Sequence, residues 1–174
     1  AVALQAVELA AVWLERAVAD GSDLEARTGM AYAATLGGLA YGTESAGAAH
    51  AMSQSAGGVH DCSHGALTAR LLGPVSEFNA PASPERYARL ARGLGADVAG
   101  LSPLEAAYAG IRELDRLTDA VGIPTLAELG FSEDEIPMLA RIAFEDPQTV
   151  GNPREITGPA DYEEIWRATF ARGS

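Results

Sequence analysis

The stretch that decides the fold runs from Ser102 to Gly122 and reads SPLEAAYAGIRELDRLTDAVG. It opens with a capping box, in which the Ser102 side chain accepts a hydrogen bond from a backbone N–H in the first turn and Glu105 reaches back. Pro103 stands at the first helical position, and Gly122 follows the last apolar turn, where helices commonly end on glycine. These signals predict a helix over residues 102–121.

The same signals for helix starts and ends recur along the rest of the chain. Further capping boxes are expected at Ser22–Glu25, Thr125–Glu128 and Ser132–Glu135. No segment alternates apolar and polar residues for long enough to predict a strand. The sequence therefore predicts an all-α, multi-helix bundle in a single domain. About eight helices are expected, over residues 1–20, 23–42, 44–55, 64–79, 84–94, 102–121, 132–145 and 159–171.

One expected helix carries two adjacent glycines. Gly37 and Gly38 interrupt the segment 23–42, and each costs roughly 1 kcal/mol relative to alanine inside a helix. Close approach of a neighbouring helix is the first explanation, and room for a ligand or a neighbouring domain is the second.

Composition and charge exclude several classes of function. The chain has 174 residues, 48% of them hydrophobic, and 12 basic against 24 acidic side chains give a net charge of −12. Charge of this sign repels nucleic-acid phosphates and anionic lipid, so neither is expected as a partner. All basic residues are arginine, which excludes a Schiff-base or P-loop lysine within this chain. A single cysteine and the lack of a long apolar run predict a cytoplasmic protein without a membrane span.

The residues able to do chemistry gather in the segment HAMSQSAGGVHDCSHG, residues 50–65. It holds every histidine and the only cysteine, and neutral imidazole is the commonest metal ligand. His50 could meet His64 across the Gly-rich turn, or His60 and His64 with Cys62 could form a zinc-binding fragment. Spacing alone does not choose between these arrangements. A nucleophilic Cys62 beside a histidine is a third chemistry, disfavoured because no oxyanion-hole loop is visible.

Around this segment the sequence resembles the C-terminal helical domain of the iron-dependent (group III) alcohol dehydrogenases, which has a dehydroquinate-synthase-like architecture. The family pattern G-x-x-H-[AS]-[MIL]-[AS]-H-x-x-G-[GA] is matched over Gly47–Gly58, apart from a glutamine in place of the second histidine. It continues in His64-Gly65 and in Pro74–Asn79, and the tail 152–154 gives support. The match covers nearly the whole chain.

The resemblance implies a set of site residues. His50 and His64 would be ligands of a metal ion, Fe²⁺ in this family or Zn²⁺ in glycerol dehydrogenase-like branches. An Asp and a further His would come from a helix upstream of this chain. Gln54 stands where many members have another histidine, so it is expected to be the catalytic position beside the nicotinamide, with both Gln54 and His64 at the cofactor. Residues 60–62 would form a solvent-exposed turn.

The implied activity interconverts a primary or small secondary alcohol with its aldehyde or ketone, using NAD or NADP. The sequence begins at Ala1 directly in an amphipathic pattern, which suggests a fragment or a chain processed upstream. The family's nucleotide-binding domain is absent from this chain, so the chain alone is expected to be inactive and to bind metal weakly. The expected partners are a small alcohol or aldehyde, that missing domain and further copies in a homo-oligomer. The alternative function is a catalytically incomplete helical domain that serves assembly or interaction.

Overall fold

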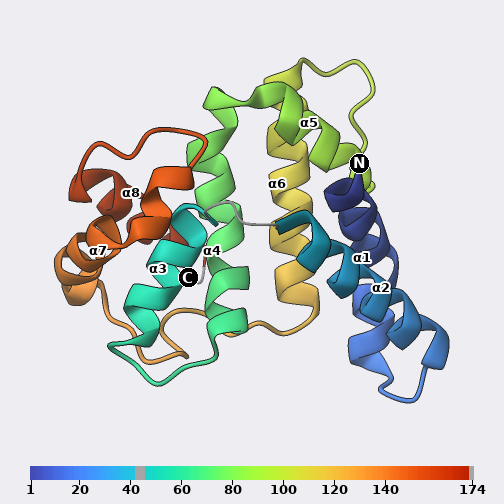
Figure 1. Cartoon of the computed structure of the whole chain (residues 1–174), viewed down its shortest axis with the longest axis horizontal. Helices are drawn as coiled ribbons and strands as arrows, with labels where there is room; N and C mark the ends of the chain where they lie inside the picture. The colour runs from blue at the N-terminus through green and yellow to red at the C-terminus, as the bar shows by residue number, and fades with distance from the viewer. Residues whose placement is uncertain (42–45, 173–174) are drawn as a thin grey trace. The chain divides into compact units, whose positions relative to one another are not determined.

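The computed structural model describes residues 1–41 and 46–172. Those residues form eight α-helices and three short 3-10 segments, with no strand among them (Figure 1). The predicted all-α fold is confirmed, and most helix ends lie within a few residues of their predicted positions. The helices are α1 Val2–Ala19, α2 Leu24–Tyr41, α3 Ala48–Gly57, α4 His64–Asn79, α5 Pro84–Gly93, α6 Pro103–Ala120, α7 Ile136–Glu145 and α8 Pro159–Ala171; the 3-10 segments are η1 Ala80–Ala82, η2 Glu133–Glu135 and η3 Pro147–Gly151.

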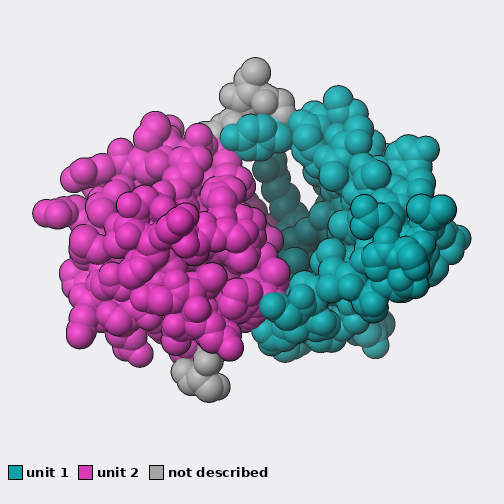
Figure 2. All heavy atoms as spheres, turned by 90° about the horizontal axis from the view of Figure 1, so that it is seen from below, with its two compact units in different colours: residues 1–44, 84–122 teal, residues 45–83, 123–174 magenta. Residues whose placement is uncertain are grey.

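The helices divide between two compact units, which Figure 2 shows in different colours. Unit 1 comprises Ala1–Glu44 and Pro84–Gly122, and unit 2 comprises Ser45–Ser83 and Ile123–Ser174. The chain therefore passes from one unit to the other several times. The sequence predicted one domain over residues 1–174, and whether the two units act as one domain stays a prediction.

Unit 1 is built from α1, α2, α5 and α6, in which α1 packs on α2 and α5 packs on α6. Small side chains bring these helices close together. A Cβ added to Gly110 of α6 would stand 2.6 Å from the Cβ of Ala91 on α5, and one added to Gly29 would meet the Trp13 ring. Glycine at these two positions is therefore a packing requirement.

Unit 2 is built from α3, α4, α7 and α8, with α3 in contact with both α4 and α7. Its core holds the largest fully buried side chains of the described residues, including Trp166 and Tyr162 of α8 and Met52 of α3. All three histidines belong to this unit. The core of unit 2 is thus the support on which the candidate site stands.

The predicted capping boxes have three different outcomes. The box at Ser102 and Glu105 is confirmed, with both reciprocal bonds present. The one at Ser22 is wrong, because the Asp23 carboxylate accepts the hydrogen bond from the Ala26 N–H while the Ser22 hydroxyl donates to Asp20. A carboxylate accepts more strongly than a hydroxyl, so the neighbouring acid takes the cap.

The other two boxes form at shorter elements than an α-helix. Thr125 and Glu128 exchange the expected bonds around a turn. Ser132 and Glu135 enclose η2, which leads directly into α7. Both motifs therefore satisfy backbone N–H groups, although Thr125 opens no helix.

The explanation of Gly37 and Gly38 by close helix approach is wrong for the described residues. A Cβ added at either glycine would meet nothing within 4 Å. Both lie exposed near the end of α2. Separately, no helix within the described ranges is both long and apolar enough to cross a membrane.

These contrasting glycines give a stability prediction for unit 1. Gly110→Ala should lower the free energy of unfolding by about 1–3 kcal/mol, because its new methyl overlaps Ala91. Gly38→Ala should raise it by up to about 1 kcal/mol, because alanine is the better helix former and space is open. Chemical denaturation followed by circular dichroism measures both. Equal effects of the two substitutions would contradict the packing described for Gly110.

Candidate metal centre

His50 is placed by the packing of α3. Seven of the ten residues of this helix are buried, whereas His50 is partly exposed and Gln54, one turn later, is exposed. Residues four apart share one face of a helix, so His50 and Gln54 lie on the same open face. The buried face of α3 contacts α4 and α7. Core packing on one side of α3 therefore presents these two polar side chains on the other.

His64 is placed by the start of α4. Ser63 caps this helix, and its hydroxyl accepts a hydrogen bond from the Ala66 N–H at 3.4 Å. His64 is consequently the first helical residue, with an exposed side chain. Its Nε2 atom lies 3.5 Å from the hydroxyl of Thr68, at the outer limit of a hydrogen bond.

The two imidazole rings converge. Their centroids are 5.5 Å apart, and the ring planes are inclined by 60°. With metal–nitrogen bonds of about 2.0–2.1 Å, two imidazoles on one ion at a near-tetrahedral angle have ring centres roughly 5 Å apart. The observed separation between His50 and His64 therefore fits two ligands of one cation.

The surroundings of His50 favour its neutral form. Partial burial lowers the pKa of His50, and the neighbouring His64 ring lowers it further. A metal ligand must be unprotonated, so this shift suits the coordination of a cation near neutral pH. Burial and the neighbouring ring both disfavour the protonated form of His50, in which the proton would compete with a metal ion for the nitrogen.

The described residues bring together two candidate metal ligands, His50 and His64. Within residues 1–41 and 46–172, no group of three or more His, Cys, Asp or Glu side chains is arranged to hold a metal ion. Metal sites usually have at least three protein ligands. The pair fits the chemistry of the expected cation but is fewer than the usual number of ligands.

His60 does not join the pair. Its Nε2 atom lies 2.7 Å from Oε1 of Glu135, and its ring stands edge-on to Phe131 with centroids 4.4 Å apart. The backbone N–H of Ser132 lowers the pKa of Glu135, and the hydrogen bond to His60 adds to that shift. The zinc fragment of His60, Cys62 and His64 is therefore absent from the structure.

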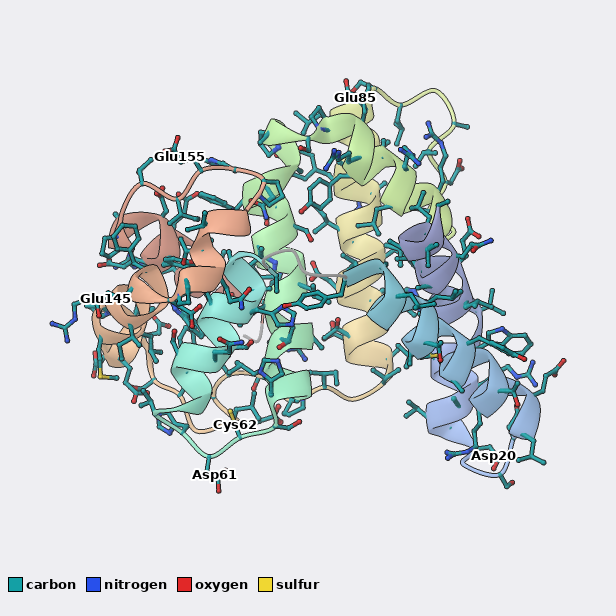
Figure 3. All side chains as sticks on the ribbon, in the orientation of Figure 1. Asp20, Asp61, Cys62, Glu85, Glu145 and Glu155 are labelled. Atoms are coloured by element: carbon teal, nitrogen blue, oxygen red, sulfur yellow. The ribbon has the colours of Figure 1, made fainter. Side chains whose placement is uncertain are left out.

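The expectation of a wholly exposed turn at residues 60–62 is also wrong in two of its three positions. Asp61 is exposed and points away from the helices (Figure 3). The His60 side chain, by contrast, is only 29% exposed, and Cys62 packs against the core of unit 2. Burial raises the pKa of the Cys62 thiol, and the Asp61 charge raises it further. A nucleophilic cysteine needs the opposite shift.

Several residues near the site have partners that no local sequence pattern indicates. Glu135 is 75 positions from its partner His60, and Asn152 is 104 positions from Ala48, whose N–H it binds. Only the folded chain brings such pairs together. The resemblance had marked Asn79 and the 152–154 tail as motif residues without showing that they meet.

Comparison with known proteins identifies a matching family and several sequence relatives. Residues 1–170 match the Fe-containing alcohol dehydrogenase family, C-terminal. The choline dehydrogenase of Bacillus subtilis is 49% identical over 170 residues, covering 98% of this chain and 42% of that protein. The NAD-dependent methanol dehydrogenase of Bacillus methanolicus is 42% identical over 158 residues, covering 90% of this chain and 42% of that protein.

Solved structures agree with the sequence relatives. A crystal structure of 1,3-propanediol oxidoreductase superposes with a TM-score of 0.93 at 39% identity, over 97% of this chain and 44% of that one. An alcohol dehydrogenase from Oenococcus oeni gives a TM-score of 0.91 at 36% identity, over 95% and 43%. The family resemblance expected from the sequence is confirmed. The chain spans less than half the length of these relatives.

The pKa of His50 in the metal-free chain can be predicted. His64→Ala should raise it, because the neighbouring ring is removed, but not to its ordinary value, because burial is the larger cause. The unfolded chain binds this proton more tightly than the folded one. The free energy of unfolding should therefore fall as the pH is lowered through about 6.5.

Proton NMR titration of the histidine rings measures these values. His60→Ala is the control, because the His60 ring bonds to Glu135 and faces Phe131 instead of joining the His50–His64 pair. A lower or unchanged pKa of His50 after His64→Ala would contradict the convergence of the two rings.

Proposed function

The chain belongs to the Fe-containing alcohol dehydrogenase family, as its C-terminal domain, and from this premise we propose that it is the metal-binding half of an NAD(P)-dependent alcohol dehydrogenase. The observation that carries the proposal is the convergence of His50 and His64 with ring centroids 5.5 Å apart. The spacing suits one cation, and the lowered pKa of His50 suits a neutral ligand.

In the proposed site, His50 from α3 and His64 from the start of α4 hold a divalent cation, Fe²⁺ or, as the alternative, Zn²⁺. When bound, such a cation lowers the pKa of an alcohol hydroxyl strongly toward neutrality, and a nicotinamide cofactor accepts the hydride. The protein's own part is to favour the neutral form of His50 and to direct both imidazoles at one point.

Gln54 is proposed to line the substrate or nicotinamide pocket. It stands exposed one helical turn from His50, on the same face of α3. Its amide can donate and accept hydrogen bonds, but it does not titrate near neutral pH. In this proposal Gln54 orients a polar group of substrate or cofactor, and any proton relay runs through other groups. His64 would also border the cofactor.

The remaining parts of the active site are proposed to lie in a nucleotide-binding half. The relatives are more than twice as long as the matched region, since this chain covers 42% of the Bacillus subtilis protein. That half would supply the Asp and His ligands and the phosphate contacts for NAD or NADP. The chain by itself is therefore proposed to be inactive, and the complete enzyme to act as a homo-oligomer.

The substrate is proposed to be a primary or small secondary alcohol. Relatives that match nearly the whole chain carry the names choline dehydrogenase and 1,3-propanediol dehydrogenase, at 49% and 40% identity. A first panel of substrates would therefore contain choline, 1,3-propanediol and methanol with each of the two nicotinamide cofactors.

A second candidate function is a catalytically incomplete domain that serves assembly or interaction. The presence of only two converging ligands within the described residues and of the non-titrating Gln54 favours it. The metal content of the complete protein separates the two candidates, because a domain retained only for assembly needs no cation at His50 and His64.

Removing either proposed ligand tests the metal assignment. In the complete enzyme, His50→Ala and His64→Ala should each lower bound iron or zinc and reduce alcohol oxidation by more than about 100-fold, because the cation loses an anchor. Elemental analysis and initial rates measure these effects. His60→Ala is the matched control, because this ring bonds to Glu135, and it should retain metal. Normal metal content in either ligand variant would exclude that residue as a ligand.

The role of Gln54 has a separate test. Gln54→Ala should lower kcat/KM by about tenfold while metal content stays unchanged, because a hydrogen bond is lost but no ligand. Gln54→His should add a titration near pH 6.5 to the profile of kcat, since the new imidazole can exchange protons with the substrate. Identical pH profiles of Gln54→His and the parent enzyme would place position 54 outside the reacting groups.

A further inference from the structure

The first turn of α3 lacks a cap of its own. Its N-cap residue is Gly47, which has no side chain to accept a hydrogen bond from the first backbone N–H groups. The missing acceptors come from the loop around η3. The Ala48 N–H donates to Oδ1 of Asn152 at 3.2 Å, and the Ala46 N–H donates to Oε1 of Gln148 at 2.7 Å. A distant segment therefore fixes the start of the helix.

Asn152 is itself held in one orientation. Its Nδ2 group donates to Oδ1 of Asn79 at 2.7 Å and to the carbonyl of Arg154 at 2.7 Å. Asn79 in turn donates to Oδ1 of Asn152 at 3.0 Å. Since the Ala48 N–H requires an acceptor, only this orientation of the Asn152 amide satisfies every partner.

One amide of the pair is buried and the other is partly buried. The Asn79 residue is only 2% exposed, whereas Asn152 is of intermediate exposure, and a buried amide that loses its partner is costly. The η3 loop is anchored independently, because the Thr149 hydroxyl contacts the carbonyl of Ala143 at 2.9 Å and the hydroxyl of Tyr162 at 2.7 Å. Asn152 therefore connects the start of α3 to a loop that other contacts hold in place.

Gly47 allows the amide to come close. Its backbone has φ of +80°, a conformation that favours glycine, and an added Cβ would lie 3.4 Å from Oδ1 of Asn152. The carbonyl of Gly47 then accepts the N–H of His50 at 3.1 Å. His50 therefore belongs to the turn whose first N–H is held by Asn152.

We propose that Asn152, oriented by Asn79, is the positioning residue for His50 and sets the direction in which this imidazole meets His64. This inference rests on the proposed function, because it assigns Asn152 a part in the same metal site. His64 has separate support from the Ser63 cap of α4. Loss of Asn152 should consequently disturb one ring of the pair and spare the other, which a general loss of stability would not do.

The three histidines of the chain make this selectivity measurable. Their ring protons can be assigned with His50→Ala, His60→Ala and His64→Ala, and followed by NMR while Co²⁺ is added to the 174-residue chain. In the parent chain, Co²⁺ should broaden the His50 and His64 signals together. The metal-free chain should show a nuclear Overhauser effect between these two rings, whose centroids are 5.5 Å apart.

Asn152→Ala should weaken Co²⁺ binding by about tenfold, the lower end of the range for loss of a ligand-orienting partner. It should abolish the contact between the rings in the metal-free chain and reduce the broadening of His50 more than that of His64. Asn152→Asp keeps an acceptor for the Ala48 N–H, so its Co²⁺ affinity should lie between those of the parent and Asn152→Ala. Asn152→Asp also serves as the test if the alanine variant does not fold.

Thr169→Val is the matched control for stability. It removes a buried side-chain hydrogen bond in the same unit, from the Thr169 hydroxyl to the carbonyl of Ile165, and should leave Co²⁺ binding unchanged. The inference is overturned if the Asn152 variants retain the ring contact and the parent affinity, or lose them no more than Thr169→Val does. If His50→Ala does not alter Co²⁺ binding, the proposed function fails, and the ring contact in the metal-free chain still decides whether Asn152 positions His50.

Discussion

The feature on which the rest of this site depends is the approach of two imidazole rings from consecutive helices, 5.5 Å between centroids. Two such rings repel each other when protonated, and partial burial adds a further penalty for charge at His50. The arrangement therefore favours the neutral form of His50, which is the form of imidazole that binds a cation.

Each ring is held by interactions that reach far along the sequence. The packing of α3 against α4 and α7 fixes the axis of the helix that carries His50. At the other end of that helix, the His60 ring bonds to Glu135, 75 positions away, and faces Phe131, so it stays apart from the pair.

The sequence predicts the helices well because their ends are local. Ser102 and Glu105 lie three residues apart, so no tertiary contact is needed to form that cap. The capping box predicted at Ser22 was wrong for an equally local reason. The Ser22 hydroxyl donates to Asp20, and the Asp23 carboxylate accepts the Ala26 N–H in its place. The close-packing explanation of Gly37 and Gly38 was wrong for a different reason, because the sequence of a helix does not show whether the space around it is open.

The candidate metal centre was likewise predictable from the sequence only in part. From spacing alone, the zinc fragment of His60, Cys62 and His64 was as good a candidate as the pair of His50 and His64. Only the family pattern favoured the pair. The structure decides against the zinc fragment through a partner of His60 that is 75 residues away. The bonds of Asn79 and Asn152 were similarly out of reach, because each amide is 73 positions from the other. Long-range polar pairs of this kind are set by the complete fold.

The proposed metal site would explain why long-range polar contacts surround only two candidate ligands. A cation held by four protein groups is fixed by their mutual geometry, since each ligand restrains the others through the ion. In the proposed site, the two imidazoles of this chain have no such restraint until a cation and further ligands are bound. Their directions must then be set by the protein alone, by a helix cap for His64 and by the packing and first-turn bonds of α3 for His50. If the proposed function holds, these contacts keep both imidazoles directed at the metal position before the other ligands bind.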